Sequence, residues 1–350
     1  MGHANEAEQA QALAGLRAQL AHARDAQTPL RIMGGDTKRA WWQTSAVTPL
    51  SLRAYTGIVA YEPSELVITA RAGTLLQDIE TTLAARGQML GFEPPNTGAA
   101  STLGGVIAAA LSGPARPYRG GVRDFVLGVR LLTCAGDSVR FGGQVMKNVA
   151  GYDISRLVTG AWGRLGPLLE VSLRVTPQPA QILAAKWRCD ERAAWQRMRE
   201  FGSKTYPISG CRYDGTFLHL RLSGSIPAID AALNALAPET VSEGLEEWQA
   251  WRDFAHPFFD SKEPIWRAVV PPASAPLPVE AECLWDWGGA LRWYTRVSDP
   301  ALLKRAVVAA GGHVRPWLAT GLELEAGVQA DALTTRVMAS FDPTGMFNPA

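Results

Sequence analysis

One short segment has the residue types needed to bind a phosphate group. An apolar run from Leu30 ends at Met33 and leads into Gly34-Gly35-Asp36-Thr37-Lys38. Glycine permits a positive φ and a close backbone approach, so successive N–H groups can point inward and form an anion nest. On its own, this loop is better explained by an ordinary Gly-Gly turn, because it matches neither a Walker A loop nor a Rossmann fingerprint. Other segments of the sequence are needed to distinguish a phosphate-binding loop from an ordinary turn.

A second candidate segment, from Pro94 to Gly105 (PPNTGAASTLGG), is almost free of large side chains. A backbone that wraps closely around a flat, extended cofactor needs small residues and many free N–H groups, and this run supplies both. The alternative is the tightly packed start of an Ala/Gly-rich helix. A third glycine pattern, GRLGPLLE, follows at residues 163–170.

These loops need strands and helices to position them. The pattern predicts strands at 57–62 and 66–71, then a helix that Thr74 caps and Gly87 ends. It also predicts a hairpin that turns at 135–137, and an alternating strand from 169 to 175. This βαβ-like rhythm is typical of an α/β or α+β domain.

Composition limits the possible functions. The 350 residues are 47% hydrophobic and 19% charged, which favours two soluble globular domains. The formal charge of +1 gives no reason to expect a nucleic-acid or anionic-membrane partner. No stretch approaches 18 apolar residues, and the N-terminus reads as a polar amphipathic helix with Leu13, Leu16 and Leu20 on one face. We therefore expect neither export nor a membrane span.

The four cysteines are Cys134, Cys189, Cys211 and Cys283, and they lie far apart. Their spacing has no CxxC pair and no ferredoxin-like cluster, so we expect no iron-sulfur centre and no bound metal. Reduced thiols in a cytoplasmic protein are the simpler interpretation.

The order of the motifs is more specific than any one of them. The series GGDTK, PPNTGAASTLGG, GGVRDFVLGV, KNVAGYDISRL and GRLGPLLE resembles the FAD-binding domain of the vanillyl-alcohol oxidase and para-cresol methylhydroxylase (PCMH) flavoprotein family. Residues 341–349 are similar to that family's closing segment.

The resemblance implies an α+β fold. A two-subdomain PCMH-type FAD-binding domain (residues 28–177) would follow an N-terminal helix (1–27). A smaller ferredoxin-like α+β cap domain (178–330) would come next, and the C-terminal segment (331–350) would return to the FAD domain.

The resemblance also implies which residues contact FAD. The diphosphate would be held by Met33, Gly34, Gly35, Asp36, Thr37 and Lys38. The ribityl and flavin side would be lined by Pro95, Thr97, Gly98, Thr102, Gly104 and Gly105, with Gly113 and Asp124 completing that wall. The adenine would lie against Gly163, Gly166 and Leu168, and Asn348 would approach the isoalloxazine.

Two details of this cofactor site go beyond the family pattern. Asp36 departs from the commoner GGGT, and we expect its side chain to point away from the diphosphate and cap the next helix. Covalent attachment of FAD is not expected, because the first glycine-rich loops hold no His or Cys and Cys134 falls on a predicted strand.

Within the family, four stretches resemble the E subunits of bacterial glycolate oxidases. They are AYTGIVAYEPSELVITARAGT, RGQMLGFEPP, SGPARPYRGGVRDFVLG and WGGALRW. That resemblance implies a catalytic FAD-containing D subunit and an iron-sulfur F subunit as partners. The complex would be peripheral to the cytoplasmic membrane.

Oxidation of a 2-hydroxy acid needs a cation for the carboxylate and a base for the hydroxyl proton. Arg212, Arg267 and Arg292 are candidates for the cation, although a surface or structural role is the simpler interpretation of each. The histidines stand alone, without the paired-histidine metal element of related hydroxy-acid dehydrogenases. No catalytic residue is assigned.

These observations leave three interpretations. The chain oxidises a small hydroxy acid itself, or it is a flavin-carrying electron-transfer subunit whose partner performs the oxidation. The absence of metal-site histidines and of cluster cysteines from the sequence favours the second. A stand-alone oxidase of the sugar-lactone type is the third, and no local feature supports it.

Overall fold

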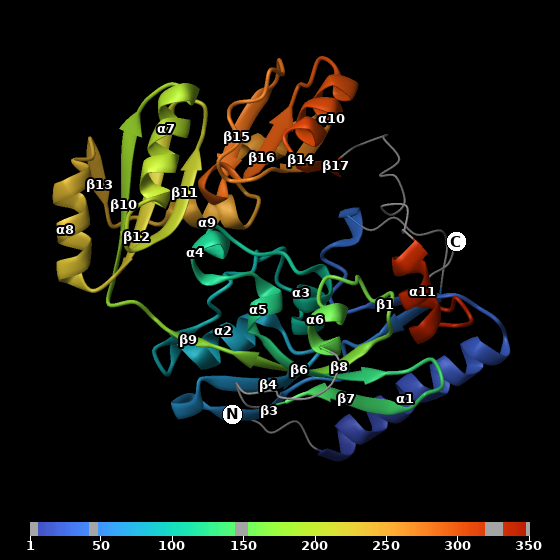
Figure 1. Cartoon of the computed structure of the whole chain (residues 1–350). Helices are drawn as coiled ribbons and strands as arrows, with labels where there is room; N and C mark the ends of the chain where they lie inside the picture. The colour runs from blue at the N-terminus through green and yellow to red at the C-terminus, as the bar shows by residue number, and fades with distance from the viewer. Residues whose placement is uncertain (1–5, 42–47, 144–152, 319–331, 348–350) are drawn as a thin grey trace. The chain divides into compact units, whose positions relative to one another are not determined.

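The structure is a computed structural model that describes residues 6–41, 48–143, 153–318 and 332–347. The chain divides into two compact units, which Figure 1 shows in colours that follow the sequence. Unit 1 comprises Met1–Ser112, Gly120–Gln178 and Glu325–Ala350, and unit 2 comprises Gly113–Arg119 and Pro179–Leu324. The domain boundaries inferred from the sequence stay a prediction.

Unit 1 is built from a parallel strand pair, an antiparallel sheet and short helices. The parallel pair is β1 (Leu30–Met33) and β2 (Thr48–Ser51). The antiparallel sheet has the order β3 (Ile58–Glu62), β4 (Val67–Arg71), β8 (Leu168–Arg174), β6 (Val126–Leu132) and β7 (Ser138–Gly142). A short pair joins β5 (Gln88–Met89) to β9 (Thr176–Pro177). The helices are α1 (Glu6–Asp25), α2 (Leu76–Ala84), α3 (Leu103–Ala109), α5 (Val122–Phe125), α6 (Ile154–Val158) and α11 (Ala332–Phe341), with 3-10 turns η1 (Arg39–Trp41) and η2 (Pro63–Glu65).

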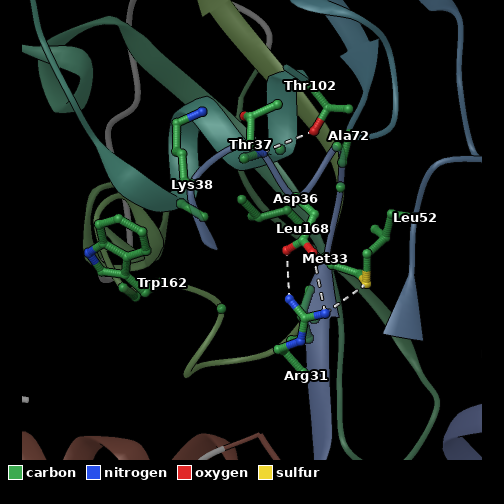
Figure 2. Close-up of a pocket in the computed structure, with 18 of the residues that line it drawn as sticks. Arg31, Met33, Asp36, Thr37, Lys38, Leu52, Ala72, Thr102, Trp162 and Leu168 are labelled. Carbon is green, nitrogen blue, oxygen red and sulfur yellow. Dashed lines mark hydrogen bonds and ion pairs between the residues drawn. The ribbon is translucent and has the colours of Figure 1, made fainter. Parts of the chain in front are cut away.

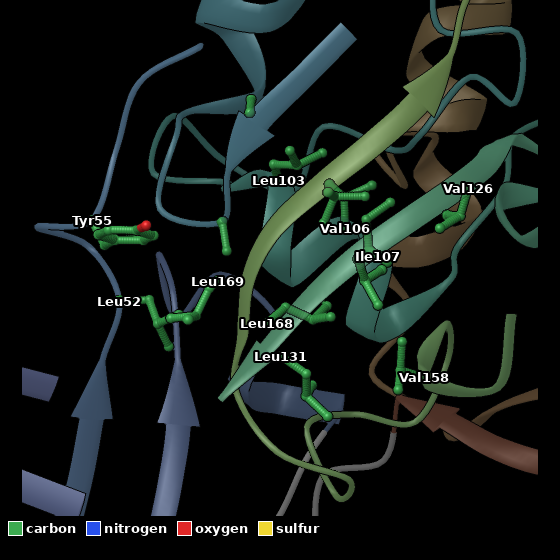
Figure 3. Packing of buried hydrophobic residues seen from close by; sticks show 14 of the residues in the cluster. Leu52, Tyr55, Leu103, Val106, Ile107, Val126, Leu131, Val158, Leu168 and Leu169 are labelled. Atoms are coloured by element: carbon green, nitrogen blue, oxygen red, sulfur yellow. The ribbon is translucent and has the colours of Figure 1, made fainter. Parts of the chain in front are cut away.

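The core of unit 1 lies between the central strand β8 and helix α3. Leu169 and Val171 alternate along β8 with no exposed surface, and they belong to one cluster with Val106 and Ile107 of α3 (Figure 3). Burying a side chain of this size contributes about 1.5–3 kcal/mol. This packing fixes where α3 begins, and the N-terminal turn of α3 borders the cavity described below.

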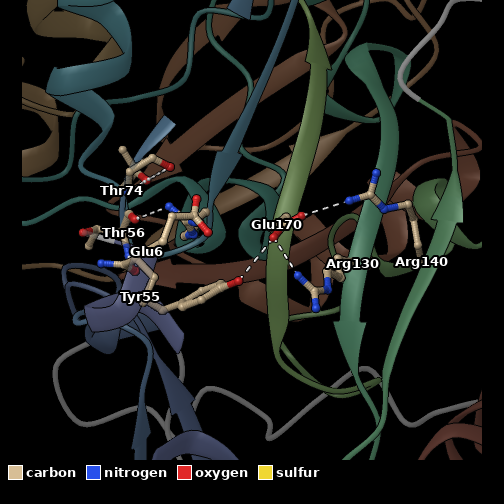
Figure 4. Close-up of polar contacts among 10 residues, drawn as sticks. Glu6, Tyr55, Thr56, Thr74, Arg130, Arg140 and Glu170 are labelled. Carbon is tan, nitrogen blue, oxygen red and sulfur yellow. Dashed lines mark hydrogen bonds and ion pairs between the residues drawn. The ribbon is translucent and has the colours of Figure 1, made fainter. Parts of the chain in front are cut away.

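The intervening side chains of β8 are polar. The buried carboxylate of Glu170 accepts hydrogen bonds from Arg130 (2.9 Å), Arg140 (3.2 Å) and the Tyr55 hydroxyl (3.2 Å), as Figure 4 shows. Because a buried charge is costly unless it is paired, this network keeps the strands β6, β7 and β8 in register.

Helix α1 confirms the predicted apolar face, since Leu16 and Leu20 are buried in the core of unit 1. Arg17 and Arg24 of the same helix donate to the carbonyls of Gly136 and Ala135. Those carbonyls belong to the turn of the β6–β7 hairpin, which was also predicted and is confirmed.

Two local predictions are wrong. Thr74 does not cap α2, because its hydroxyl accepts from the Gly57 N–H (2.9 Å) and donates to the Gly57 carbonyl (3.2 Å) instead. Cys134 lies in the turn after β6 rather than on a strand.

The end of the chain packs on unit 1 beside β1. Met346 and Phe347 are part of its core, and the Met346 carbonyl accepts from the Leu30 N–H (2.8 Å). The Asp342 carboxylate accepts from the N–H groups of Met346 and Phe347, which holds this segment in a tight turn.

Unit 2 is one antiparallel sheet with helices. Its strand order is β13 (Thr240–Ser242), β10 (Gln181–Arg188), β12 (Phe217–Gly224), β11 (Ile208–Tyr213), β15 (Glu282–Asp286), β16 (Leu291–Thr295), β14 (Ile265–Val269) and β17 (His313–Leu318). Its helices are α4 (Arg116–Arg119), α7 (Glu191–Gly202), α8 (Ile226–Leu236), α9 (Glu246–Arg252) and α10 (Pro300–Ala309), with η3 (Pro257–Asp260) and η4 (Trp287–Gly289).

The predicted ferredoxin-like topology is present, and it occurs twice. The sequence β10-α7-β11-β12-α8-β13 pairs in the order fourth, first, third, second strand, which is the ferredoxin-like arrangement. The strands β14, β15, β16 and β17 pair in the same order, with a loop in place of the first helix. The two halves join through β11 and β15, where Tyr213 pairs with Trp285.

The two faces of this sheet differ because side chains alternate along each strand. One set, including Leu220, Trp266 and Tyr294, is apolar and packs in the buried clusters of unit 2. The alternate positions carry arginines and tryptophans. We call these positions the Arg/Trp face: Arg212, His219, Arg221, Arg267, Trp293, Arg315 and Trp317.

Candidate cofactor-binding site

A cavity opens in unit 1 around the loop that follows β1. It encloses about 940 Å³ of space, part of it open to solvent. Its walls are the loop 33–38, the first turn of α3 and the segment 161–168. Figure 2 shows Thr37 and Lys38 beside Thr102, with Trp162 and Leu168 on other walls.

The two glycines of the loop are required by close packing. A Cβ on Gly34 would collide with the Thr102 hydroxyl, and one on Gly35 would collide with the Ala100 carbonyl. Thr102 in turn caps α3, since its Oγ1 accepts from the Gly105 N–H (3.4 Å). The loop backbone therefore lies directly against the start of α3, leaving a surface of backbone and small side chains toward the cavity.

Lys38 places a cation at this surface. Its ammonium donates to the hydroxyls of Thr97 (3.1 Å) and Ser101 (3.4 Å), and the Thr97 hydroxyl also bonds that of Thr37 (2.8 Å). Among the described residues no carboxylate pairs with Lys38. Burial lowers the pKa of this ammonium to about 8, which marks a charge that lacks an anion.

The expectation that Asp36 caps the next helix is wrong. Its carboxylate pairs with Arg31 (2.6 Å) and lies 3.8 Å from the exposed Arg39, as the dashed lines below Asp36 in Figure 2 partly show. A salt bridge with β1 neutralises the acid, and the loop keeps a net positive charge from Lys38 and Arg39. The donor set and charge fit a diphosphate, because backbone N–H groups and cations are what bind phosphates.

The opposite wall depends on two more glycines. Gly163 and Gly166 have φ of 80° and 119°, a region that disfavours other residues. The Gly166 N–H donates to the Gly163 carbonyl (3.0 Å), and a Cβ on Gly166 would lie 2.8 Å from the Leu132 carbonyl. This tight turn brings the backbone before Leu168 against β1 and β6, where a flat ring can be recognised by main-chain groups.

The structure brings most of the residues inferred from the sequence to this one cavity. The lining includes Met33, Gly34, Gly35, Asp36, Thr37, Lys38, Thr102, Gly104, Gly105, Gly163, Gly166 and Leu168. Thr97 contacts the loop through Thr37 and Lys38, and Gly98 lies beside Thr37. Pro95 is buried two residues before Thr97 in the chain, and it is not among the lining residues.

Two inferred residues, Gly113 and Asp124, are not among the lining residues of this cavity. Gly113 belongs to unit 2, where its carbonyl accepts from the Trp287 indole N–H (3.1 Å). The Asp124 carboxylate accepts from the Gly121 N–H (2.8 Å) at the start of α5. Asn348 lies outside the described residues.

The sequence reasoning missed several lining residues, namely Arg31, Ile32, Arg39, Leu52, Ala72, Ala108, Val158, Ala161, Trp162 and Leu165. Most are apolar and carry no motif. Arg31 had a signal, since an arginine three residues before the first glycine follows the buried Leu30 of β1 and can reach Asp36.

Among the residues that the structure describes, no three His, Cys, Asp or Glu side chains gather as metal ligands. No helix in this part of the chain is long and apolar enough to cross a bilayer.

Comparisons with known proteins agree with the geometry. A family described as an FAD binding domain matches residues 9–142. The glycolate oxidase subunit GlcE of Escherichia coli (strain K12) is 40% identical over 324 residues, which cover 92% of each chain. The glycolate oxidase subunit GlcD of Bacillus subtilis (strain 168) is 34% identical over 125 residues, covering 35% of this chain and 26% of that protein.

A solved structure of an alkyldihydroxyacetonephosphate synthase superposes with a TM-score of 0.67. The alignment covers 95% of this chain and 75% of that one at 16% identity, so it shows a shared fold alone. The family match and the GlcE relative together show an FAD-binding domain in this chain.

Proposed function

Because this chain belongs to the family of the glycolate oxidase subunit GlcE, we propose that it is the FAD-binding subunit of a glycolate oxidase. The complex would convert the 2-hydroxy acid glycolate to the 2-oxo acid glyoxylate, and electrons would pass through the flavin to an iron-sulfur partner. The observation that carries this proposal is the glycine-walled, cationic cavity of unit 1.

The residues around the cavity have separate tasks in this proposal. The loop from Met33 to Lys38 binds the FAD diphosphate through backbone N–H groups, and the Lys38 ammonium supplies the counter-charge. The turn from Gly163 to Gly166 admits the adenine beside Leu168. When bound, the flavin supplies the chemistry of accepting a hydride and releasing electrons. No His or Cys is among the described residues that line the cavity, which supports non-covalent binding.

The proposed partners are a catalytic FAD-containing D subunit and an iron-sulfur F subunit. The similarity to proteins named as two different subunits of one enzyme supports an assembly of several chains. All four cysteines are free, which is compatible with a reducing cytoplasmic compartment. We propose a cytoplasmic complex that reaches the inner face of the membrane through its partners.

A second candidate function is that the chain itself oxidises a small hydroxy acid. One observation favours it: Arg267 and Arg315 of unit 2 have no anionic partner among the described residues. Arginine forks of this kind suit a substrate carboxylate.

Co-expression with the D and F subunits tests the proposed function. We expect the three chains to co-elute and to reduce a dye when glycolate is added, and we expect this activity to disappear when the present chain is replaced by its Gly35→Ala variant. Full activity of the D and F subunits without this chain would contradict the proposal.

A further inference from the structure

Lys38 is an amine that faces the cavity of unit 1. Its side chain is one of those that line the cavity, and it lies beside Thr37 in Figure 2. Its hydrogen-bond partners are the hydroxyl groups of Thr97 (3.1 Å) and Ser101 (3.4 Å). A carboxylate partner would hold a lysine as its ammonium ion, whereas hydroxyl groups stabilise that charge much less. The position of Lys38 therefore favours loss of its proton.

Burial affects this amine and the thiols of the chain in opposite ways. Burial raises the pKa of the Cys189 and Cys211 thiols, and it raises the pKa of Cys283 to about 12, so the reactive thiolate is rare at each. Burial lowers the pKa of the Lys38 ammonium to about 8, and the reactive form of a lysine is its neutral amine. Compared with a lysine of pKa 10.5, Lys38 has on the order of a hundredfold more neutral amine at neutral pH.

The loop around Lys38 attracts a reagent that carries negative charge. Arg31 and Asp36 form a salt bridge (2.6 Å), so the cations Lys38 and Arg39 give the loop a net positive charge at the cavity. The glycine backbone of the same loop suits an acid group as well as a phosphate, because both accept hydrogen bonds from N–H groups. A small molecule bound by its acid group in this loop has its remaining atoms close to the Lys38 nitrogen.

We propose that Lys38 of the FAD-free chain is a modification site, at which a small aldehyde that carries a carboxylate forms a reversible imine. The lysine nitrogen bonds to the aldehyde carbon as the carbon–oxygen double bond becomes single, and the oxygen takes up the proton that the nitrogen releases. Loss of water then leaves a carbon–nitrogen double bond, so the step needs no oxidant or reductant. The hydroxyl groups of Thr97 and Ser101 lie next to the nitrogen and can pass the proton.

The imine and FAD exclude each other. The adduct occupies the part of the cavity that faces the loop and replaces the cation there with a carboxylate, which repels a diphosphate. Bound FAD protects Lys38 in turn, because a diphosphate beside the nitrogen holds it as an ammonium ion.

The natural aldehyde is identified by the reaction of the complex. That it is glyoxylate, the 2-oxo acid product, rests on the proposed function, whereas the reactivity of Lys38 does not. Glyoxylate that accumulates before FAD is bound then keeps newly made chains free of cofactor, while chains that already hold FAD are unaffected.

Trapping of the imine tests this site. The full chain, freed of FAD, is treated with glyoxylate and cyanoborohydride at neutral pH, and the modified lysines are mapped by mass spectrometry of its peptides. We expect Lys38 to be modified at least about tenfold faster than the exposed Lys204, because more of it is neutral. Addition of FAD before glyoxylate should abolish modification of Lys38 and leave that of Lys204 unchanged. Acetaldehyde lacks the carboxylate, so it should show a smaller preference for Lys38.

A matched variant separates the adduct from general damage to the chain. Lys38→Arg keeps a cation in the loop, but its guanidinium stays protonated and forms no imine. Glyoxylate and cyanoborohydride should abolish subsequent FAD binding by the wild type and leave FAD binding by Lys38→Arg as it was before treatment.

Equal modification of Lys38 and Lys204, or modification of Lys38 that FAD does not prevent, overturns the site. An equal preference for Lys38 with acetaldehyde overturns the requirement for an acid group. Modification of Lys38 that FAD prevents, in a chain whose complex with the D and F subunits does not oxidise glycolate, would keep the site and refute the proposed function.

Discussion

Replacing Lys38 by Met should make the chain more stable without FAD and weaker in binding it. The ammonium is enclosed with only hydroxyl partners, so burial lowers its pKa from 10.5 to about 8. That difference is worth about 3 kcal/mol, and partial solvent access reduces it to about 1–2 kcal/mol. Methionine keeps much of the length of the side chain and removes this cost.

The same substitution removes the cation that faces the diphosphate. Loss of a charge-assisted hydrogen bond costs about 1.5–3 kcal/mol, which corresponds to a Kd for FAD raised about 10- to 150-fold. A lysine that serves binding is distinguished from a structural one because its removal raises the stability of the apo chain and lowers the affinity for the cofactor.

The pH dependence follows from the direction of the shift. The folded apo chain has the lower pKa, so the unfolded chain binds more protons between pH 8 and 10.5, and apo stability rises with pH across that window. Bound diphosphate raises the pKa of Lys38, so FAD affinity should fall as the pH rises above about 8.

Thermal melts of the deflavinated chain and a fluorescence titration with FAD measure both quantities. We expect Lys38→Met to raise the apo Tm by about 2–4 °C and to remove the pH dependence, while the exposed Lys204→Met changes neither. A lower apo Tm together with an unchanged Kd for FAD would refute this account of Lys38.

Three further predictions concern unit 1. Gly35→Ala should abolish FAD retention because its Cβ collides with a backbone carbonyl, whereas Gly15→Ala on α1 should not, since its Cβ meets nothing within 4 Å; flavin content after purification measures this. Arg31→Gln should raise the Kd for FAD about tenfold by leaving Asp36 unneutralised, and Asp36→Asn in the same chain should restore most of the affinity. Glu170→Gln should lower the free energy of unfolding by about 2–4 kcal/mol, measured by urea titration, because Arg130 loses its buried counter-ion.

Each of these has an outcome that would contradict it. Normal flavin content in Gly35→Ala would show that the loop does not pack as described. Additive effects of the Arg31 and Asp36 substitutions would argue against their coupling. A Glu170→Gln chain as stable as the wild type would mean that the network on β8 is solvated.

The glycine loops could be predicted because their requirement is local. Gly34 and Gly35 stand where a side chain has no room, and Gly163 and Gly166 have backbone conformations that other residues disfavour. The ordered series of small residues was therefore enough to predict most of the cavity lining. Residues of the GRLGPLLE segment line the same cavity as the loop from Met33 to Lys38.

What could not be predicted depends on pairing between distant residues. We expected the Asp36 carboxylate to cap the next helix, but it accepts a hydrogen bond from Arg31 instead. The side chain of Arg31 on β1 points toward the loop and reaches that carboxylate. Arg267 and Arg315 lie 48 positions apart in the sequence, and only the register of β14 and β17 makes them neighbours. The second ferredoxin-like half was equally hidden, because its first helix is replaced by a loop.

An anaerobic visible spectrum of the purified chain, recorded before and after excess glycolate and again after addition of the D and F subunits, tests the central claim most directly. We predict bound oxidised flavin that keeps its yellow colour with glycolate alone and bleaches once the partners are present. A chain that carries no flavin, or a flavin that stays oxidised in the full complex, would contradict the assignment as the FAD-binding subunit of a glycolate oxidase.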